Sequence, residues 1–139
     1  GRRAVSMLRV LFREAARADA DTLVRACLAQ RGVEVFHNSQ GVEGLCLLLI
    51  AKPGQDALHA ACDEVRRLLP GAQVKLRENL AALLALCRTT REVPKLAAAM
   101  ESAGVPVHHL VQTPPGALFC VNDSQYETAL RAAYALAFG

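Results

Sequence analysis

Histidine and cysteine are the side chains with which this 139-residue chain could carry out nucleophilic or metal chemistry. His37 lies in the stretch GVEVFHNSQ, and His109 lies in the similar stretch GVPVHHLVQ. The apolar runs that follow these stretches contain Cys46 and Cys120. If each run is a strand beside its histidine, a thiol could pair with imidazole as nucleophile and base, or His108 could join them in binding a metal.

The spacing of these residues argues against both kinds of site. The chain contains no CxxC, HxH or HExxH motif, no glycine-rich phosphate loop and no GxSxG elbow. His37 and His109 occupy equivalent places in two similar stretches, which favours a packing or interface role. We therefore expect no catalytic residue, no metal site and no cofactor, so that the chain by itself is not an enzyme.

The similarity of the two stretches extends over much of the chain. Residues 23–62 align without a gap on residues 95–134, an offset of 72 positions. Gly32 then matches Gly104, Gly44 matches Gly116, and ALHAA matches ALRAA. The same offset at several separated places indicates a duplicated unit.

Hydrophobic periodicity predicts the elements of each copy. Apolar runs at 5–12 and 80–87 predict a strand, and each is followed by a helix that ends at Gly32 or Gly104. Asp19 or Asp21 is the expected N-cap of the first helix, and two strands follow each glycine as a hairpin. A second helix at 55–69 or 124–138 carries an apolar stripe, which in the second copy contains Leu130, Ala133 and Ala137.

The predicted fold is α+β, with two ferredoxin-like βαββαβ repeats whose antiparallel sheets carry helices on one face. The first repeat spans 1-77 and ends with a strand at 73–76, and the second spans 78-139. Because the sequence stops after the second helix of that repeat, we expect its final strand to be absent. A segment preceding Gly1 or the facing repeat of another molecule is the expected donor, since an open sheet edge promotes association.

Composition excludes several kinds of partner. The net charge is +3 with scattered basic residues, which argues against nucleic acid, and no apolar run approaches the roughly 18 residues of a membrane span. The five cysteines form no disulfide framework, and the first residues do not resemble a signal peptide. We therefore expect reduced thiols and a cytoplasmic location.

Several stretches resemble a known family. The helix-to-strand junctions LAQRGVEV and MESAGVPV, the join VKLRENLAALLALC and the end ALAFG are similar to tandem ACT domains, and most of all to the C-terminal regulatory region of aspartokinases. The resemblance implies an allosteric feedback module that senses lysine or threonine, forms a homodimer through its sheets or helices, and follows a kinase domain. Its first loops depart from the family, which usually has Pro-Gly where this chain has Ala18-Asp19 and Thr90-Arg91.

An amino-acid effector needs donors for its carboxylate and acceptors for its ammonium group. By the resemblance, the site lies where the first loop of each repeat meets the second strand. The candidate ligand-binding residues are Asp19, Asp21, Asn38, Ser39 and Gln40 in the first repeat, and Thr89, Thr90, Arg91, Gln112 and Thr113 in the second. The alternative is that the Asp and Thr side chains cap helices, the Gln side chains bond to backbone, and the chain is a ligand-free ACT-type dimerisation module.

Overall fold

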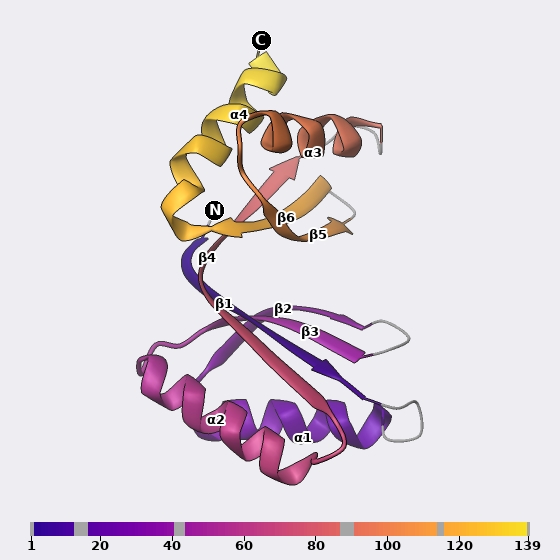
Figure 1. The fold of residues 1–139 in the computed structure, drawn as a ribbon, viewed down its shortest axis with the longest axis vertical. Coiled ribbons are helices and arrows are strands. Elements are labelled where there is room, and N and C mark those ends of the chain that lie inside the picture. Colours follow the sequence, from indigo (N-terminus) through magenta and orange to yellow (C-terminus); the bar gives the residue numbers. More distant parts are fainter. Residues whose placement is uncertain (1, 13–16, 41–43, 87–90, 114–115, 139) are drawn as a thin grey trace. The chain divides into compact units, whose positions relative to one another are not determined.

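The computed structural model describes residues 2–12, 17–40, 44–86, 91–113 and 116–138 (Figure 1). Within these ranges no helix combines the length and apolar character that crossing a membrane requires. The elements follow in the order β1 (Arg2–Leu11), α1 (Arg17–Gln30), β2 (Glu34–Gln40), β3 (Gly44–Ile50), α2 (Gln55–Leu68), β4 (Gln73–Leu86), α3 (Glu92–Ser102), β5 (Val107–Thr113), β6 (Gly116–Asn122), the short 3-10 helix η2 (Asp123–Gln125) and α4 (Tyr126–Phe138).

The strands are hydrogen-bonded in the order β2-β3-β1-β4-β6-β5, so the predicted α+β class and antiparallel pairing are confirmed. The chain divides into two compact units. The first unit is Val5–Glu78, and the second unit combines Gly1–Ala4 with Asn79–Gly139. Strands β1 and β4 therefore each pass from one unit into the other.

This division differs from the expected boundaries of 1-77 and 78-139 with an absent final strand. The strand order is β2-β3-β1-β4 in the first unit and β5-β6-β4-β1 in the second, so the start of β1 takes the place of the fourth strand. The start of β1 thus supplies pairing that was expected to come from a segment before Gly1 or from another molecule. Periodicity did not indicate this, because the first four residues contain no apolar pattern that predicts a strand.

Both boundaries between the units carry a residue with a left-handed backbone. Ala4 has φ 55° and Asn79 has φ 58°, and they are the non-glycine residues with positive φ in the described part of the chain. Asparagine tolerates this conformation because its short side chain bonds locally, whereas for alanine the left-handed region costs roughly 1–2 kcal/mol. The chain therefore accepts local strain where β1 changes units.

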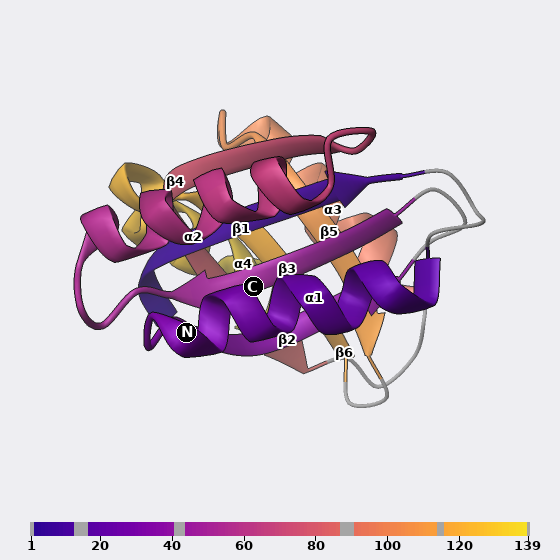
Figure 2. The ribbon, with the colours of Figure 1, turned by 90° about the horizontal axis from the view of Figure 1, so that it is seen from below.

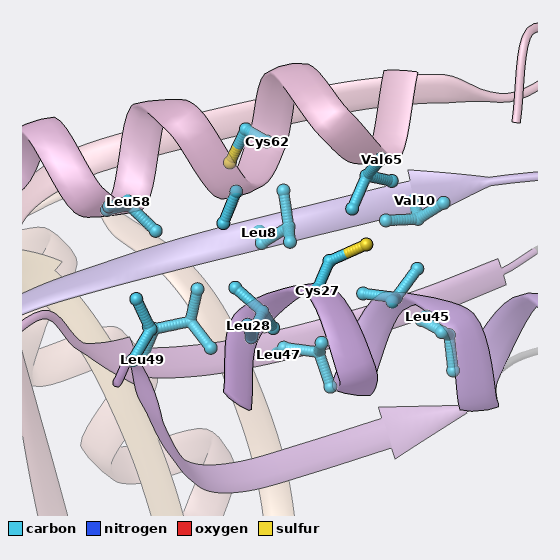
Figure 3. Close-up of a cluster of buried hydrophobic side chains, with 13 residues drawn as sticks. Leu8, Val10, Cys27, Leu28, Leu45, Leu47, Leu49, Leu58, Cys62 and Val65 are labelled. Atoms are coloured by element: carbon cyan, nitrogen blue, oxygen red, sulfur yellow. The ribbon is translucent and has the colours of Figure 1, made fainter. Parts of the chain in front are cut away.

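The core of the first unit lies between its sheet and the helices α1 and α2, which contact each other over one sheet face (Figure 2). Alternate residues of β1 and β3 point to this core, as a sheet covered on that face requires. Burial raises the pKa of Cys62 to about 11, so its thiol is neutral and acts as a small apolar side chain (Figure 3). The buried side chains are Leu8, Val10, Val24, Cys27, Leu28, Val33, Leu45, Leu47, Leu49, Leu58, Ala61, Cys62 and Val65.

The second unit has smaller clusters of buried apolar residues. Its last helix, α4, buries a different face from the one that the sequence predicts. Ala129 is fully buried while Leu130 is 46% exposed, so the prediction that Leu130 belongs to the buried stripe is wrong. Ala133 does pack on the core, and the side chain of Ala137 lies outside the described residues. The turn η2 precedes α4 directly, and the buried stripe of α4 includes the first residue of the helix, Tyr126.

Both predicted glycine helix ends are confirmed. Gly32 has φ 72° and Gly104 has φ 74°, which favours glycine because it lacks a Cβ. Beyond each glycine a backbone amide reaches back to the helix, with Val33 N–H donating to Leu28 O at 3.0 Å and Val105 N–H donating to Met100 O at 2.9 Å. These bonds form the Schellman motif that ends a helix.

Replacing either glycine by valine tests these helix ends. Gly104→Val should lower the free energy of unfolding by about 1–2 kcal/mol through the left-handed backbone alone. Gly32→Val should lose more, because a Cβ there lies 3.1 Å from Cγ of Pro53. Chemical denaturation measures both, and Gly71→Val is the control, since Gly71 is not among the glycines with positive φ and its Cβ would also meet nothing within 4 Å. Equal stability of all three variants would contradict the assignment.

Ala4→Gly tests the strain at the boundary between the units. Glycine adopts a positive φ without the Cβ clash, so the variant should gain up to about 1 kcal/mol in the free energy of unfolding. Ala26→Gly is the matched control, since Ala26 is exposed in α1 and the change should cost about 1 kcal/mol. The same loss in both variants would show that Ala4 carries no strain.

Candidate functional site

The first candidate site begins at the N-terminus of α1. Because α1 begins at Arg17, Asp19 lies in its first turn and the prediction that Asp19 or Asp21 is the N-cap is wrong. The carboxylate of Asp19 is exposed in the first turn of the helix, where the N–H groups have no intrahelical partner and negative charge is favourable. Asp21 instead accepts a hydrogen bond from Nε of Arg25 at 2.9 Å, which leaves Asp19 as the available acid.

The register of the edge strand β2 separates the other three residues. Asn38 lies opposite Leu47, and Gln40 lies opposite Leu45, and both leucines belong to the core beneath the helices. Residues opposite each other in an antiparallel pair share a face, so positions 38 and 40 lie on the face that α1 contacts (Figure 2). Ser39 lies opposite Cys46 on the other face, and so does not join them.

The second unit repeats part of this arrangement. Arg91 precedes α3, is exposed and makes no side-chain cap, while Gln112 lies opposite the core residue Ala117 on the helix-covered face. Thr113 is the next residue of the strand and lies opposite Gly116. Thr89 and Thr90 lie outside the described residues.

A row of polar residues on the other face of the sheet was not predicted from the sequence. Arg9 and Ser39 both lie opposite Cys46, and both hydrogen-bond to its thiol. Burial raises the pKa of Cys46 despite these contacts, so the thiol stays neutral and is a poor nucleophile. The sequence feature that could have indicated this row is Arg9, a charged residue inside the apolar run 5–12. The second unit has Leu84, Leu118 and Val111 in the corresponding row.

The remaining titratable side chains offer little chemistry. Desolvation lowers the pKa of His37, which therefore is neutral at pH 7, and its Nε2 atom is buried without a hydrogen-bond partner among the described residues. No group of three or more His, Cys, Asp or Glu residues in the described ranges could hold a metal ion. In the described part of the chain, the geometry thus offers binding groups at a helix start and an edge strand rather than a nucleophile with its base.

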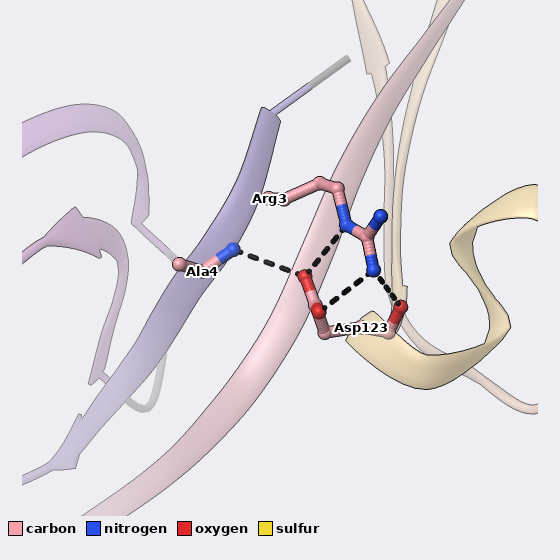
Figure 4. A network of polar contacts seen from close by, with 3 residues as sticks. All are labelled: Arg3, Ala4 and Asp123. Atoms are coloured by element: carbon pink, nitrogen blue, oxygen red, sulfur yellow. Dashed lines mark hydrogen bonds and ion pairs between the residues drawn. The ribbon is translucent and has the colours of Figure 1, made fainter.

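A second polar cluster fixes the start of β1 in the second unit (Figure 4). Arg3 donates from Nε to Oδ1 of Asp123 at 3.3 Å, and from Nη2 to Oδ2 at 3.1 Å and to the backbone oxygen at 3.2 Å. The amide of Ala4 donates to the same Oδ1 at 3.1 Å, and the guanidinium lies 5.1 Å from the ring centre of Tyr126. The hydrogen bond from Arg3 is the main reason why the pKa of Asp123 is lowered.

Known structures share this fold. The aspartate kinase of Clostridium acetobutylicum matches with a TM-score of 0.79 and 15% identity over 96% of this chain and 32% of that chain. The regulatory subunit of aspartate kinase from Thermus flavus matches with a TM-score of 0.73 and 19% identity over 96% of this chain and 92% of that chain. Escherichia coli aspartokinase III, in complex with lysine and aspartate, matches at 0.69 and 17% identity over 99% of this chain and 32% of that chain.

These matches confirm, at the level of the fold, the resemblance to the regulatory region of aspartate kinases. The chain spans about a third of the length of the Clostridium enzyme and nearly all of the Thermus subunit. No protein-family model and no curated protein sequence matches it.

Replacing Asp123 by Asn tests whether its carboxylate holds the start of β1. Because the folded-state pKa of Asp123 is lowered, the carboxylate stabilises the fold above its unfolded pKa of about 4, and this stability is lost as the pH falls through the lower folded-state pKa. Asp123→Asn should therefore lower the free energy of unfolding at pH 7, and the difference from the parent chain should shrink toward about pH 2. Urea unfolding at several pH values measures it.

The control is Asp63→Asn, which removes an exposed ion pair to Arg66 one helical turn away. Such surface pairs contribute little, so this variant should match the parent chain across the pH range. A loss in Asp123→Asn that does not change with pH would assign the effect to packing instead of charge.

Proposed function

We propose that the chain is the regulatory, amino-acid-sensing region of an aspartokinase-like enzyme of aspartate-family biosynthesis, built from two ACT repeats that share strands. The observation that supports it most is the match to a separate regulatory subunit over 92% of that subunit's length, together with polar groups at a helix start beside an edge strand. Lysine or threonine is the proposed effector, acting by feedback on an upstream kinase domain.

The first unit offers the better site for an amino acid. Backbone N–H groups in the first turn of α1 can donate hydrogen bonds to the effector carboxylate, as helix N-termini bind anions. Asp19 in the first turn, with the amide groups at positions 38 and 40, can accept hydrogen bonds from an ammonium group. Ser39 is not part of this proposed site, because its register places it on the opposite face.

The candidate residues of the second unit are suited to binding the carboxylate end of the effector. Arg91 carries a positive charge at the start of α3, so it attracts a carboxylate and repels an ammonium group. Gln112 can contribute one polar contact, and Thr89, Thr90 and Thr113 are proposed to complete the set. With no acidic residue among these five, lysine should bind the first unit more tightly than the second.

Regulation follows if the effector binds two conformations unequally, since a ligand shifts an equilibrium only by its difference in affinity. We propose that the module forms a homodimer and that the dimer presents the two states to the kinase domain. Binding of the effector and the state of the kinase are then linked reciprocally.

The loops favour a second candidate function. The family usually has Pro-Gly where this chain has Ala18-Asp19 and Thr90-Arg91, so the backbone amides that face an effector there are not set by glycine. A dimerisation module that has kept the fold without the ligand would have these loops.

A thermal-shift titration with the twenty amino acids separates the two functions. At a hundredfold excess over its dissociation constant, a ligand that binds the native state adds about 2.7 kcal/mol, which for a chain of this size raises the melting temperature by roughly 5–10 °C. We expect this shift with L-lysine or L-threonine and none with the D-enantiomer. A flat response from a dimer, shown by light scattering, would support the dimerisation module.

Gln40→Leu and Gln112→Leu form a matched pair for locating the site, since the two positions are equivalent in the repeat. If lysine binds the first unit, Gln40→Leu should weaken it by about tenfold or more, because a lost hydrogen bond to a charged group costs about 1.5–3 kcal/mol. Gln112→Leu should leave its affinity unchanged. The reverse result would move the site to the second unit.

A further inference from the structure

We propose that the start of β1, Arg2–Ala4, is a strap whose docking in the second unit is coupled through η2 to the C-terminal end of α3. The proposal rests on the proposed function for its purpose, since a kinase domain upstream would be joined to this module through the strap. The coupling itself rests on contacts within the second unit.

The strap is held at one residue. Four hydrogen bonds from Arg3 and Ala4 converge on Asp123, the first residue of η2, and three of them end on its carboxylate (Figure 4). Ala4, which bonds to Asp123 through its amide, is also the residue with the strained left-handed backbone. A strained residue persists where its surroundings determine its conformation, so losing Asp123 should release the strap.

The residues around Asp123 form a chain of side-chain hydrogen bonds. Nε2 of His108 bonds to Oδ1 of Asn122 at 2.8 Å, and Nδ2 of Asn122 donates to Oε1 of Gln125 at 3.1 Å. Nε2 of Gln125 donates to the backbone oxygen of Gly104 at 2.9 Å. In this arrangement each side-chain amide donates through its nitrogen and accepts through its oxygen. Oδ1 of Asn122 is therefore an acceptor, and Nε2 of His108 carries the proton that it accepts.

This chain connects η2 with the end of α3. Gly104 terminates α3 in the Schellman motif, and Arg91, a candidate ligand residue, stands immediately before the other end of the same helix. A helix is a rigid element, so a displacement at its start is carried to its end. Gln125, two residues after Asp123, then links that end to Asn122, the residue before Asp123.

The first unit lacks this chain at the equivalent positions. Phe36, Ile50 and Pro53 stand where the second unit has His108, Asn122 and Gln125, and Pro53 packs against Gly32 without a side-chain hydrogen bond to it. A fold requirement alone would need the polar chain in both units. These hydrogen bonds occur only in the unit that also binds the strap, among the described residues, which favours a role in coupling.

Amide hydrogen exchange of the whole chain tests the coupling from both ends without an effector. Gln125→Leu removes the bond to Gly104 and should accelerate exchange at the amide of Ala4 by about tenfold, a typical allosteric coupling. Asp123→Asn should accelerate exchange at the amide of Val105, which α3 protects, by a similar factor, because coupling is reciprocal. The double variant should show less than the product of the single effects at both amides.

The amide of Leu69, bonded to Val65 O in the first unit, is the internal control and should exchange at the parent rate in every variant. Gln125→Asn is the second variant if leucine disturbs the fold, because it is polar but too short to reach Gly104. Effects confined to the mutated end, or equal acceleration at Leu69, would overturn the coupling. Because no effector is added, a flat amino-acid titration would refute the proposed function and leave this result unaffected.

Discussion

The sharing of β1 and β4 between the two units is the constraint on which the rest of the structure depends. Each unit has the order of a four-stranded ferredoxin-like sheet, but one strand in each is the continuation of a strand that belongs mostly to the other. Without the shared strand, a sheet would expose the backbone donors and acceptors of a central strand to water. Neither unit can therefore complete its sheet unless the chain passes twice between them.

Sharing explains where the structure tolerates strain and where it concentrates polar contacts. Ala4 and Asn79, the non-glycine residues with a left-handed backbone in the described ranges, lie at the two passages, and asparagine is the residue type that tolerates this backbone best after glycine. Ala4 lacks that advantage, and its amide is held by Asp123, which Arg3 also binds. The passage with the less tolerant residue is thus the one fixed by an ion pair, and Arg2–Ala4 offers little apolar surface that could hold it otherwise.

Much of this fold could be predicted from the sequence, because the elements that bury apolar stripes have clear periods. Gly32 and Gly104 marked the helix ends because a left-handed helix end nearly requires glycine. The start of β1 could not be predicted, since Arg2, Arg3 and Ala4 carry no stripe and their partner Asp123 is 120 residues away from Arg3. The face of Ser39 was equally hidden, because a bulge between Val35 and His37 shifts the register and reverses the alternation.

The two units share a strand order but differ in what their equivalent positions carry. On the face away from the helices, the first unit has Arg9, Cys46 and Ser39 where the second has leucine and valine. At the corner after the first helix, the first unit packs Pro53 on Gly32, and the second extends hydrogen bonds from Gly104 to His108. Packing could be served by the same residues in both units, so these differences indicate separate tasks. An acidic helix start in one unit and a strap in the other fit the proposed roles, in which one unit binds an effector and the other holds the N-terminal connection.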